Sequence, residues 1–162
     1  MRILKVGLTI ASCAAAFGSF GSAQAASTTA SLASSATVAA YCTVSSGSLG
    51  FGTYSASAAS TATATVTATC TNTTTYTIAL DKGTNGASET TRVMKAASSA
   101  ATLSYGIFSD SGYTTNWGTS AGSQSGTGNG SAQPFTAYGK VPSGQFVTPD
   151  SYTDTVTVTL TY

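Results

Sequence analysis

The chain has 162 residues, which is enough for one domain and too few for two of ordinary size. It contains six basic and five acidic residues and no histidine. So few cations argue against binding to nucleic acid or to an anionic membrane surface, both of which need clustered Lys and Arg. The lack of histidine removes the commonest general base and metal ligand, so we expect no catalytic residues, no metal site and no cofactor.

Residues 1–25 have the features of a secretory signal peptide. Arg2 and Lys5 form a basic start, residues 6–20 are mostly apolar or small, and residues 23–25 offer a small-x-small cleavage site. A lipoprotein signal ending at Cys13 is the alternative, but the apolar run continues past that cysteine. Cleavage after residue 25 would leave four basic residues against five acidic ones, a net charge of about −1.

Two cysteines, Cys42 and Cys70, remain after the predicted cleavage. In an exported chain, two cysteines that each lie in a strand-like segment indicate a disulfide. A metal pair is the alternative, but the chain has no histidine and no third thiolate nearby. The bridge would close a loop of about 28 residues and stabilise the fold by roughly 3–4 kcal/mol on the chain-entropy estimate.

Period-two alternation is the main structural signal. Residues 61–70 alternate threonine with alanine, valine or cysteine, which predicts a strand with one apolar face. No segment has a sustained helical period, and Gly, Ser and Asn clusters separate the apolar segments. The predicted strands cover residues 37–49, 61–70, 76–80, 103–108, 134–141 and 152–162. Short strands with turns between them predict an all-β sandwich, in which residues 118–131 form a long exposed loop.

The segment between the cleavage site and Cys42 is built of small residues. Ala30, Leu32, Ala36, Val38 and Ala40 fall on one parity. The first half of this segment has no turn signal and no hairpin partner nearby in the sequence. It is either a frayed tail or an extended strand that pairs with the edge of another sheet.

The last residues alternate up to the carboxyl end. Period two places Val156, Val158, Leu160 and Tyr162 on one face of the predicted strand and threonines on the other. No later segment is present to cover the outer edge of this strand. We therefore expect either an upstream strand or another chain to pair with it.

Two further groups of residues were considered as functional sites. Asp150 and Asp154 would lie about 13 Å apart along a strand, which is too far for a usual acid and base pair, so structural roles are favoured. Four aromatic residues could form a sugar-binding platform or pack in the core or an interface, and packing is favoured: Tyr113, Trp117, Phe135 and Tyr138.

Several motifs follow one another in a defined order. They are Tyr41-Cys42-Thr43-Val44, Leu49-Gly50-Phe51-Gly52-Thr53-Tyr54, Val66-Thr67-Ala68-Thr69-Cys70, Tyr76-Thr77-Ile78-Ala79-Leu80-Asp81, Thr91-Arg92-Val93-Met94, Leu103-Ser104-Tyr105, Trp117-Gly118, Tyr138-Gly139-Lys140-Val141-Pro142-Ser143-Gly144-Gln145 and Ser151-Tyr152-Thr153-Asp154-Thr155-Val156-Thr157-Val158. Over residues 27–162 this order resembles the spore coat U domain family, which includes the rod subunits of archaic, Csu-type chaperone–usher pili.

The resemblance implies an incomplete immunoglobulin-like sandwich that is completed by donor-strand exchange. It implies a signal peptide at 1–25, a donor strand at 26–36 and a pilin domain at 37–162. A periplasmic chaperone and an outer-membrane usher would be the assembly partners, and identical subunits would form the fibre by β-augmentation. The implied donor residues are Ala30, Leu32, Ala36 and Val38, and the implied acceptor residues are Val156, Val158, Leu160 and Tyr162. Alanines make this donor less bulky than is usual in the family.

The resemblance thus predicts a secreted fibre subunit on the cell surface that supports adhesion and biofilm formation, with no nucleic acid or small-molecule substrate. A self-complemented coat or matrix protein, whose own N-terminal strand fills the groove, is the main alternative. A carbohydrate-binding module is a weaker one.

Overall fold

The computed structural model describes residues 24–162, so the predicted signal peptide, including Cys13, lies outside the described residues except for its last two positions. The chain divides into two units, one ending at Ala36 and the other covering Thr37–Tyr162. In the first unit, described residues 24–36 contain no helix or strand, and every one of them is exposed. No helix capable of crossing a membrane occurs between residues 24 and 162.

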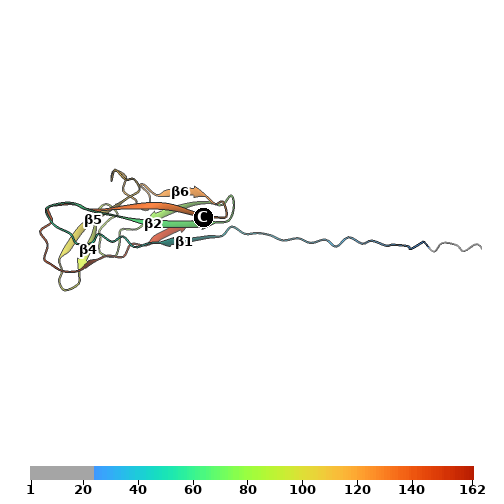
Figure 1. Cartoon of the computed structure of the whole chain (residues 1–162), viewed down its shortest axis with the longest axis horizontal. Coiled ribbons are helices and arrows are strands. Elements are labelled where there is room, and N and C mark those ends of the chain that lie inside the picture. The colour runs from blue at the N-terminus through green and yellow to red at the C-terminus, as the bar shows by residue number, and fades with distance from the viewer. Residues whose placement is uncertain (1–23) are drawn as a thin grey trace, which may run out of the picture. The chain divides into compact units, whose positions relative to one another are not determined.

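The second unit is an all-β structure, as the alternation predicts (Figure 1). Its strands are β1 (Cys42–Ser46), β2 (Ser60–Cys70), β3 (Thr75–Leu80), β4 (Arg92–Ala96), β5 (Thr102–Phe108), β6 (Gln124–Thr127), β7 (Ala132–Val141), β8 (Tyr152–Thr153) and β9 (Val158–Thr161). They form a six-stranded sheet in the order β1-β2-β7-β5-β4-β8 and a three-stranded sheet in the order β6-β3-β9. All pairings are antiparallel.

The longest strand, β2, defines the two ends of the sandwich. We call the end with the Cys42–Cys70 pair and the turn at residues 71–74 the proximal end. We call the end with the Ser60–Val141 pair and the loops at residues 47–59 and 142–151 the distal end. At ~3.3 Å per residue, the eleven residues of β2 separate the two ends by roughly 33 Å.

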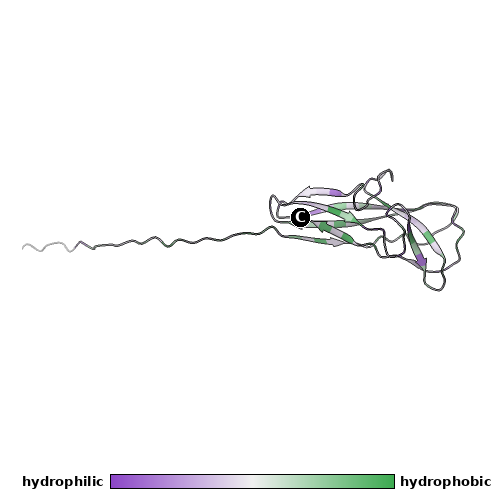
Figure 2. Cartoon of the chain, turned by 180° about the vertical axis from the view of Figure 1, so that it is seen from behind, coloured by the Kyte–Doolittle hydropathy of each residue, from purple (hydrophilic) through white to green (hydrophobic). Residues whose placement is uncertain are grey.

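The core lies between the two sheets and is filled by alternate residues of the strands. In β2 the buried residues are Val66, Ala68 and Cys70, with threonines between them. Figure 2 shows hydrophobic segments on several strands of the sandwich. The indole of Trp117 is fully buried, and its Nε1 donates a hydrogen bond of 3.0 Å to the carbonyl oxygen of Ile78. This bond satisfies the one polar atom of the indole, so the largest core side chain carries no unpaired donor.

The structure differs from the predicted strands at three places. The strand expected at residues 37–49 is confined to Cys42–Ser46, and the residues before it are exposed. Strand β4 was not predicted because it is short and contains two charged residues. The loop expected at residues 118–131 contains β6, a short polar strand at the edge of its sheet. It pairs with β3, but its residues do not alternate between apolar and polar, so the sequence did not predict a strand there.

The single strand predicted at residues 152–162 is also wrong, because β8 pairs with β4 in one sheet and β9 pairs with β3 in the other. Asp154 lies at this crossing. Its Oδ1 accepts hydrogen bonds from the backbone amides of Thr84 (3.0 Å) and Asn85 (3.2 Å), and its Oδ2 accepts one from the Tyr105 hydroxyl (2.7 Å). These bonds fix the chain where it leaves one sheet for the other.

Asp81 holds the other side of the crossing. Its Oδ1 accepts hydrogen bonds of 2.9 Å from the backbone amides of both Gly83 and Thr157. Burial acts to raise the pKa of Asp81, but these hydrogen bonds and the nearby Arg92 outweigh it and leave the pKa below its ordinary value. The ionised carboxylate is therefore the form that fits this turn.

A buried cation completes the arrangement. Arg92 is fully buried, and its guanidinium donates to the carbonyl oxygens of Leu80, Asp81 and Trp117 at 2.6–3.1 Å. Burial lowers its pKa, and the surrounding carbonyl dipoles and acidic groups favour the charged form. A long side chain from β4 thus ties together the end of β3 and the loop that carries Trp117.

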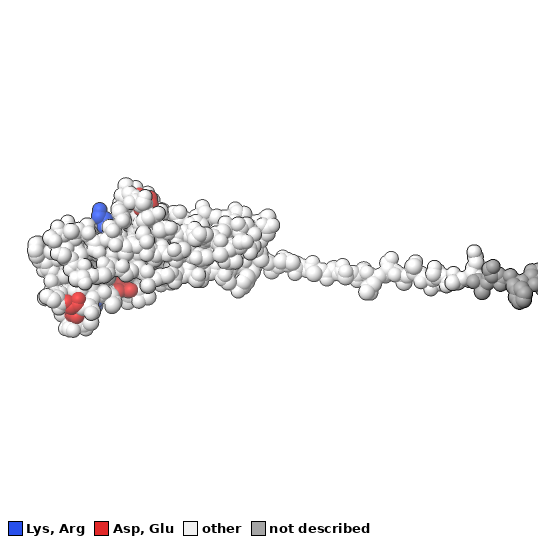
Figure 3. Space-filling view, in the orientation of Figure 1, with Lys and Arg blue, Asp and Glu red and all other residues white. Residues whose placement is uncertain are grey.

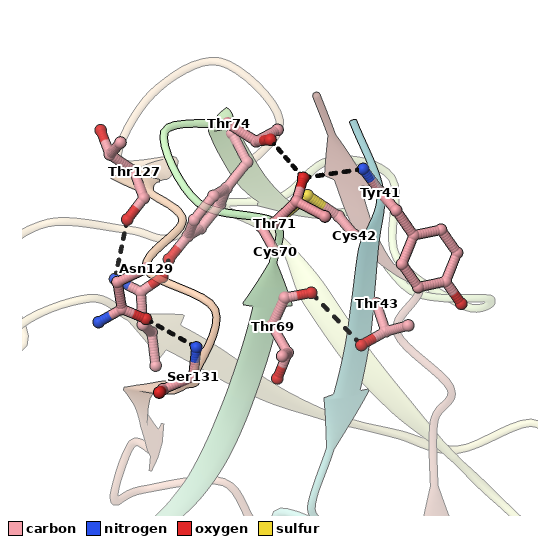
Figure 4. Close-up of a disulfide and its surroundings, with 12 residues drawn as sticks. Tyr41, Cys42, Thr43, Thr69, Cys70, Thr71, Thr74, Thr127, Asn129 and Ser131 are labelled. Carbon is pink, nitrogen blue, oxygen red and sulfur yellow. Dashed lines mark hydrogen bonds between the residues drawn. A yellow bond between two sulfur atoms is a disulfide. The ribbon is translucent and has the colours of Figure 1, made fainter. Parts of the chain in front are cut away.

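The predicted disulfide joins Cys42 of β1 to Cys70 of β2 (Figure 4). The two cysteines lie directly opposite each other in the antiparallel pair. Around the bridge, the amide of Tyr41 donates to the Thr71 hydroxyl, and the Thr43 hydroxyl donates to the carbonyl of Thr69. The bridge therefore fixes the outermost strand of the six-stranded sheet to its neighbour at the proximal end.

Removal of the disulfide should destabilise the fold, because the unfolded chain then gains conformational entropy. For a sequence separation of 28 residues, the Cys42→Ala, Cys70→Ala variant should lose about 3–4 kcal/mol of unfolding free energy in urea denaturation. Reductant should lower the stability of the wild type and leave the variant unchanged. Equal midpoints for the oxidised wild type and the variant would contradict this assignment.

Protonation of Asp81 in acid should also lower the free energy of unfolding. Because its folded pKa lies below the unfolded value of about 4, its contribution is complete above that pH and is lost as pH falls through the folded pKa. Asp81→Asn should therefore show a smaller loss of unfolding free energy between neutral pH and about pH 3 than the wild type does. Asp150→Asn, at a surface turn, is the matched control. Identical pH profiles for Asp81→Asn and the wild type would refute the prediction.

Candidate functional site: an open groove between two sheet edges

Two edge strands face each other without pairing. β1 ends the six-stranded sheet and β9 ends the three-stranded one, and their Cα atoms approach within 8 Å. Within residues 24–162 no strand pairs with the outer edge of either. Each edge therefore presents backbone N–H and C=O groups that a further strand could bind.

A cavity of about 380 Å³ lies at the distal ends of these two edges, where Ser46 and Val158 line it, and reaches the core between the sheets. Apolar side chains from both sheets and from the crossing segment line it: Val66, Leu80, Met94, Ile107, Ala137, Val156 and Val158. A second hollow of about 780 Å³ continues to the distal end, between residues 49–56 and 145–152. Both spaces share Leu49, Phe51, Met94 and Tyr152. We call these two adjoining spaces together the groove.

The floor of the groove includes Tyr105, whose hydroxyl is held by Asp154. Burial, followed by the hydrogen bond to this carboxylate, raises the pKa of Tyr105 well above its ordinary value. The phenol therefore stays protonated and donates to Asp154 at any physiological pH. This bond fixes the wall of the groove at the point where the chain changes sheets.

Three of the four predicted acceptor residues point toward the core. Val156 and Val158 line the groove, and Leu160 is half-buried against the core cluster. Tyr162 is 57% exposed and lies at the proximal end, beside residues 71–75. Sequence reasoning missed Leu49, Phe51 and Tyr152 as lining residues, although the alternation of Leu49 and Phe51 around a glycine was a usable signal.

The predicted donor residues lie outside the strands. Ala30, Leu32 and Ala36 belong to the first unit, and Leu32 is 95% exposed. Val38 belongs to the second unit and is exposed at the proximal end. Leu32 is the one large apolar side chain between residues 26 and 36.

The carboxylates of Asp150 and Asp154, the nearest acidic pair in the sequence, hold loops in place. Asp150 accepts from the backbone amides of Ser98 (2.8 Å) and Ser151 (2.7 Å), and Asp154 binds at the crossing described above. Among residues 24–162, no three His, Cys, Asp or Glu side chains gather as metal ligands.

The four aromatic residues do not form one platform. Trp117 is in the core, and Phe135 packs edge-on against buried Tyr76 at a ring distance of 6.2 Å. Tyr113 packs against Phe108 and under the ammonium of Lys140. A fully buried Trp117 is not available to stack on a sugar.

Charge is distributed unevenly over the chain. Residues 6–80 contain no Asp, Glu, Lys or Arg, and residues 155–162 contain none either. On the face shown in Figure 3, the charged side chains lie toward the end with β4, and the surface near β1 is uncharged. Both strands that flank the proximal part of the groove are thus free of charge.

Comparison with solved structures shows a shared fold. The chain is similar to a chain in the crystal structure of the CsuC–CsuE chaperone–tip adhesion subunit pre-assembly complex from archaic chaperone–usher Csu pili of Acinetobacter baumannii. The TM-score is 0.62 and the identity 21%, over 78% of this chain and 41% of that chain. The likeness supports an immunoglobulin-like sandwich, and this chain spans less than half of the other.

A search of curated proteins finds no match. The family model of the Spore Coat Protein U domain matches residues 10–159, which is nearly the whole chain. The match confirms the resemblance seen in the order of the sequence motifs. The chain belongs to the Spore Coat Protein U domain family.

Proposed function

We propose that this protein is the structural subunit of a secreted surface fibre, in which the N-terminal segment of one copy fills the groove of the next. The observation that carries the proposal is the open groove between β1 and β9, with unpaired strand edges above an apolar cavity. One added strand would pair with both edges, once they separate to about 9.6 Å (two strand spacings), and would cover the cavity. Because the donor and the groove are different surfaces, the contact is heterologous and builds an open filament.

The length of the N-terminal segment suits this role. Eleven extended residues, 26–36, span roughly 33 Å, the same as the eleven residues of β2 that separate the two ends of the sandwich. Residues 30, 32 and 36 share one parity, so their side chains would all point into the groove. The donor can therefore cover the whole open edge.

Strand directions determine how the donor would run. β3 leaves the proximal turn at Thr75, and β9 pairs with it in the antiparallel sense, so β9 runs toward the proximal end. Residues 37–41 lead into β1 at the proximal end. In a fibre whose subunits repeat by translation along the groove, the donor of one copy enters the distal mouth of the next. It then runs antiparallel to β9.

Leu32 is the proposed anchor of the donor. Moving a leucine side chain from water into an apolar groove contributes ~1.5–3 kcal/mol, whereas each alanine methyl contributes about 0.8. Because the other residues on the same face of the donor are alanine, serine or threonine, most of its apolar stabilisation would come from Leu32. The backbone pairing with β1 and β9 would supply the rest.

Before assembly, an empty groove exposes apolar surface and two strand edges, which favours aggregation. A chaperone that lends a strand would protect the subunit in the periplasm, and an outer-membrane usher would exchange it for the next donor. The solved relative, named as a chaperone–tip adhesion subunit pre-assembly complex, supports this route. The fibre would lie outside the cell and support adhesion and biofilm formation.

Leu32→Asp should abolish fibres and leave a chaperone-bound subunit, because a carboxylate cannot enter the apolar groove unpaired. Electron microscopy and polymer ladders on unheated gels measure the result. Ser31→Asp is the matched control, since its side chain has the opposite parity and should allow normal fibres. Normal fibres from Leu32→Asp would refute the proposal.

A self-complemented monomer is the competing arrangement. It would require residues 37–41 to turn tightly so that the preceding segment runs back beside β1. These residues, Thr-Val-Ala-Ala-Tyr, contain no Gly, Pro, Asn or Asp, the residues that tight turns favour. We therefore expect protein made without a chaperone to aggregate or polymerise in gel filtration. A stable soluble monomer would establish self-complementation instead.

A further inference from the structure

The exposed large hydrophobic residues of the second unit lie at its two opposite ends. Val38, Tyr41 and Tyr162 are at the proximal end, where they are 84%, 62% and 57% exposed. Phe146 is at the distal end and is 92% exposed. No other large apolar side chain among residues 37–162 is comparably exposed. The two ends therefore both carry apolar surface that a monomer leaves in water.

The proximal end is hollowed. A depression of about 600 Å³ is lined by residues 38–40, residues 71–75 and Tyr162, and we call it the proximal hollow. None of these residues has a charged side chain. An apolar side chain could enter the hollow without removing any charged side chain from water.

Phe146 is exposed but sits on an immobilised loop. The side chain of the preceding residue, Gln145, accepts a hydrogen bond from the backbone amide of Ser104 (2.8 Å) and donates one to its carbonyl oxygen (3.0 Å). It therefore binds β5 through the same backbone groups that a neighbouring strand would use. The amide of Gln145 also donates to the hydroxyl of Tyr54 (3.1 Å), which in turn donates to the carbonyl of Pro142 (2.8 Å). Binding through Phe146 would thus cost little ordering of the backbone.

We infer that Phe146 of one copy inserts into the proximal hollow of the adjacent copy and forms a second, end-to-end contact in the fibre. The inference rests on the proposed function, because translation along the groove brings the distal end of each acceptor against the proximal end of its donor. Phe146 also lines the distal mouth of the groove. The contact is therefore continuous with the place where the donor would enter.

This contact has a role that the donor strand alone cannot fill. Residues 37–41 are exposed and form no strand, so they would connect neighbouring sandwiches as a flexible link. Phe146 in the hollow formed partly by this link would hold the link and fix the angle between subunits. The end-to-end contact would set the stiffness of the fibre, while the donor strand would provide its continuity.

A cysteine pair tests the contact directly. Fibres of Phe146→Cys, Thr75→Cys protein should give a ladder of covalent multimers under mild oxidation, because Thr75 lines the hollow. Phe146→Cys with Thr63→Cys is the matched control: Thr63 is exposed in the middle of β2, away from both ends, and should give no ladder. Equal cross-linking of the two pairs, or none in either, would overturn the inference.

A second variant measures the effect on the fibre. Thr75→Trp, which fills the proximal hollow and leaves the lining of the groove unaltered, should form fibres in wild-type amounts, with an unchanged melting temperature of the subunit, but with a shorter persistence length in electron micrographs. Wild-type stiffness would overturn the end-to-end contact and leave donor-strand assembly intact. Absence of fibres from the wild-type protein would instead overturn the proposed function, and this inference with it.

Discussion

The unpaired edges of β1 and β9 are the constraint on which the rest of the structure depends. Backbone N–H and C=O groups at the edge of a sheet need partners, and the core beneath these two edges is open. The described residues form six strands in one sheet and three in the other, and the two edges approach within 8 Å, so they must separate to about 9.6 Å to receive one more strand. In the proposed fibre that strand comes from another copy, so completion of the fold and assembly are the same event.

The groove exists because the end of the chain changes sheets. If residues 152–162 formed one continuous strand, β9 would not stand opposite β1. Asp154 and Asp81 hold the crossing through backbone amides of residues 83–85 and 157, and Arg92 ties the end of β3 to the core. A small number of charged groups is thus used inside the fold to shape the apolar groove.

The surface along β1 and β9 and at the proximal end has a different character. Because residues 6–80 and 155–162 are uncharged, electrostatic steering cannot guide contacts there. Association through these surfaces would depend on apolar burial and backbone pairing, both of which vary little with salt. Charge is concentrated toward the end with β4, where it keeps part of the surface well hydrated.

The sequence by itself determined the all-β class, the core-facing parity of β2, the Cys42–Cys70 disulfide and the inward direction of Val156, Val158 and Leu160. These follow from period-two alternation and cysteine count, which are local signals. Only the tertiary structure decided the break between β8 and β9, the pairing of β4 and β6, the burial of Trp117 and the exposure of Tyr162. These depend on hydrogen bonds between residues far apart in sequence, such as Asp154 with Thr84, which no local pattern records.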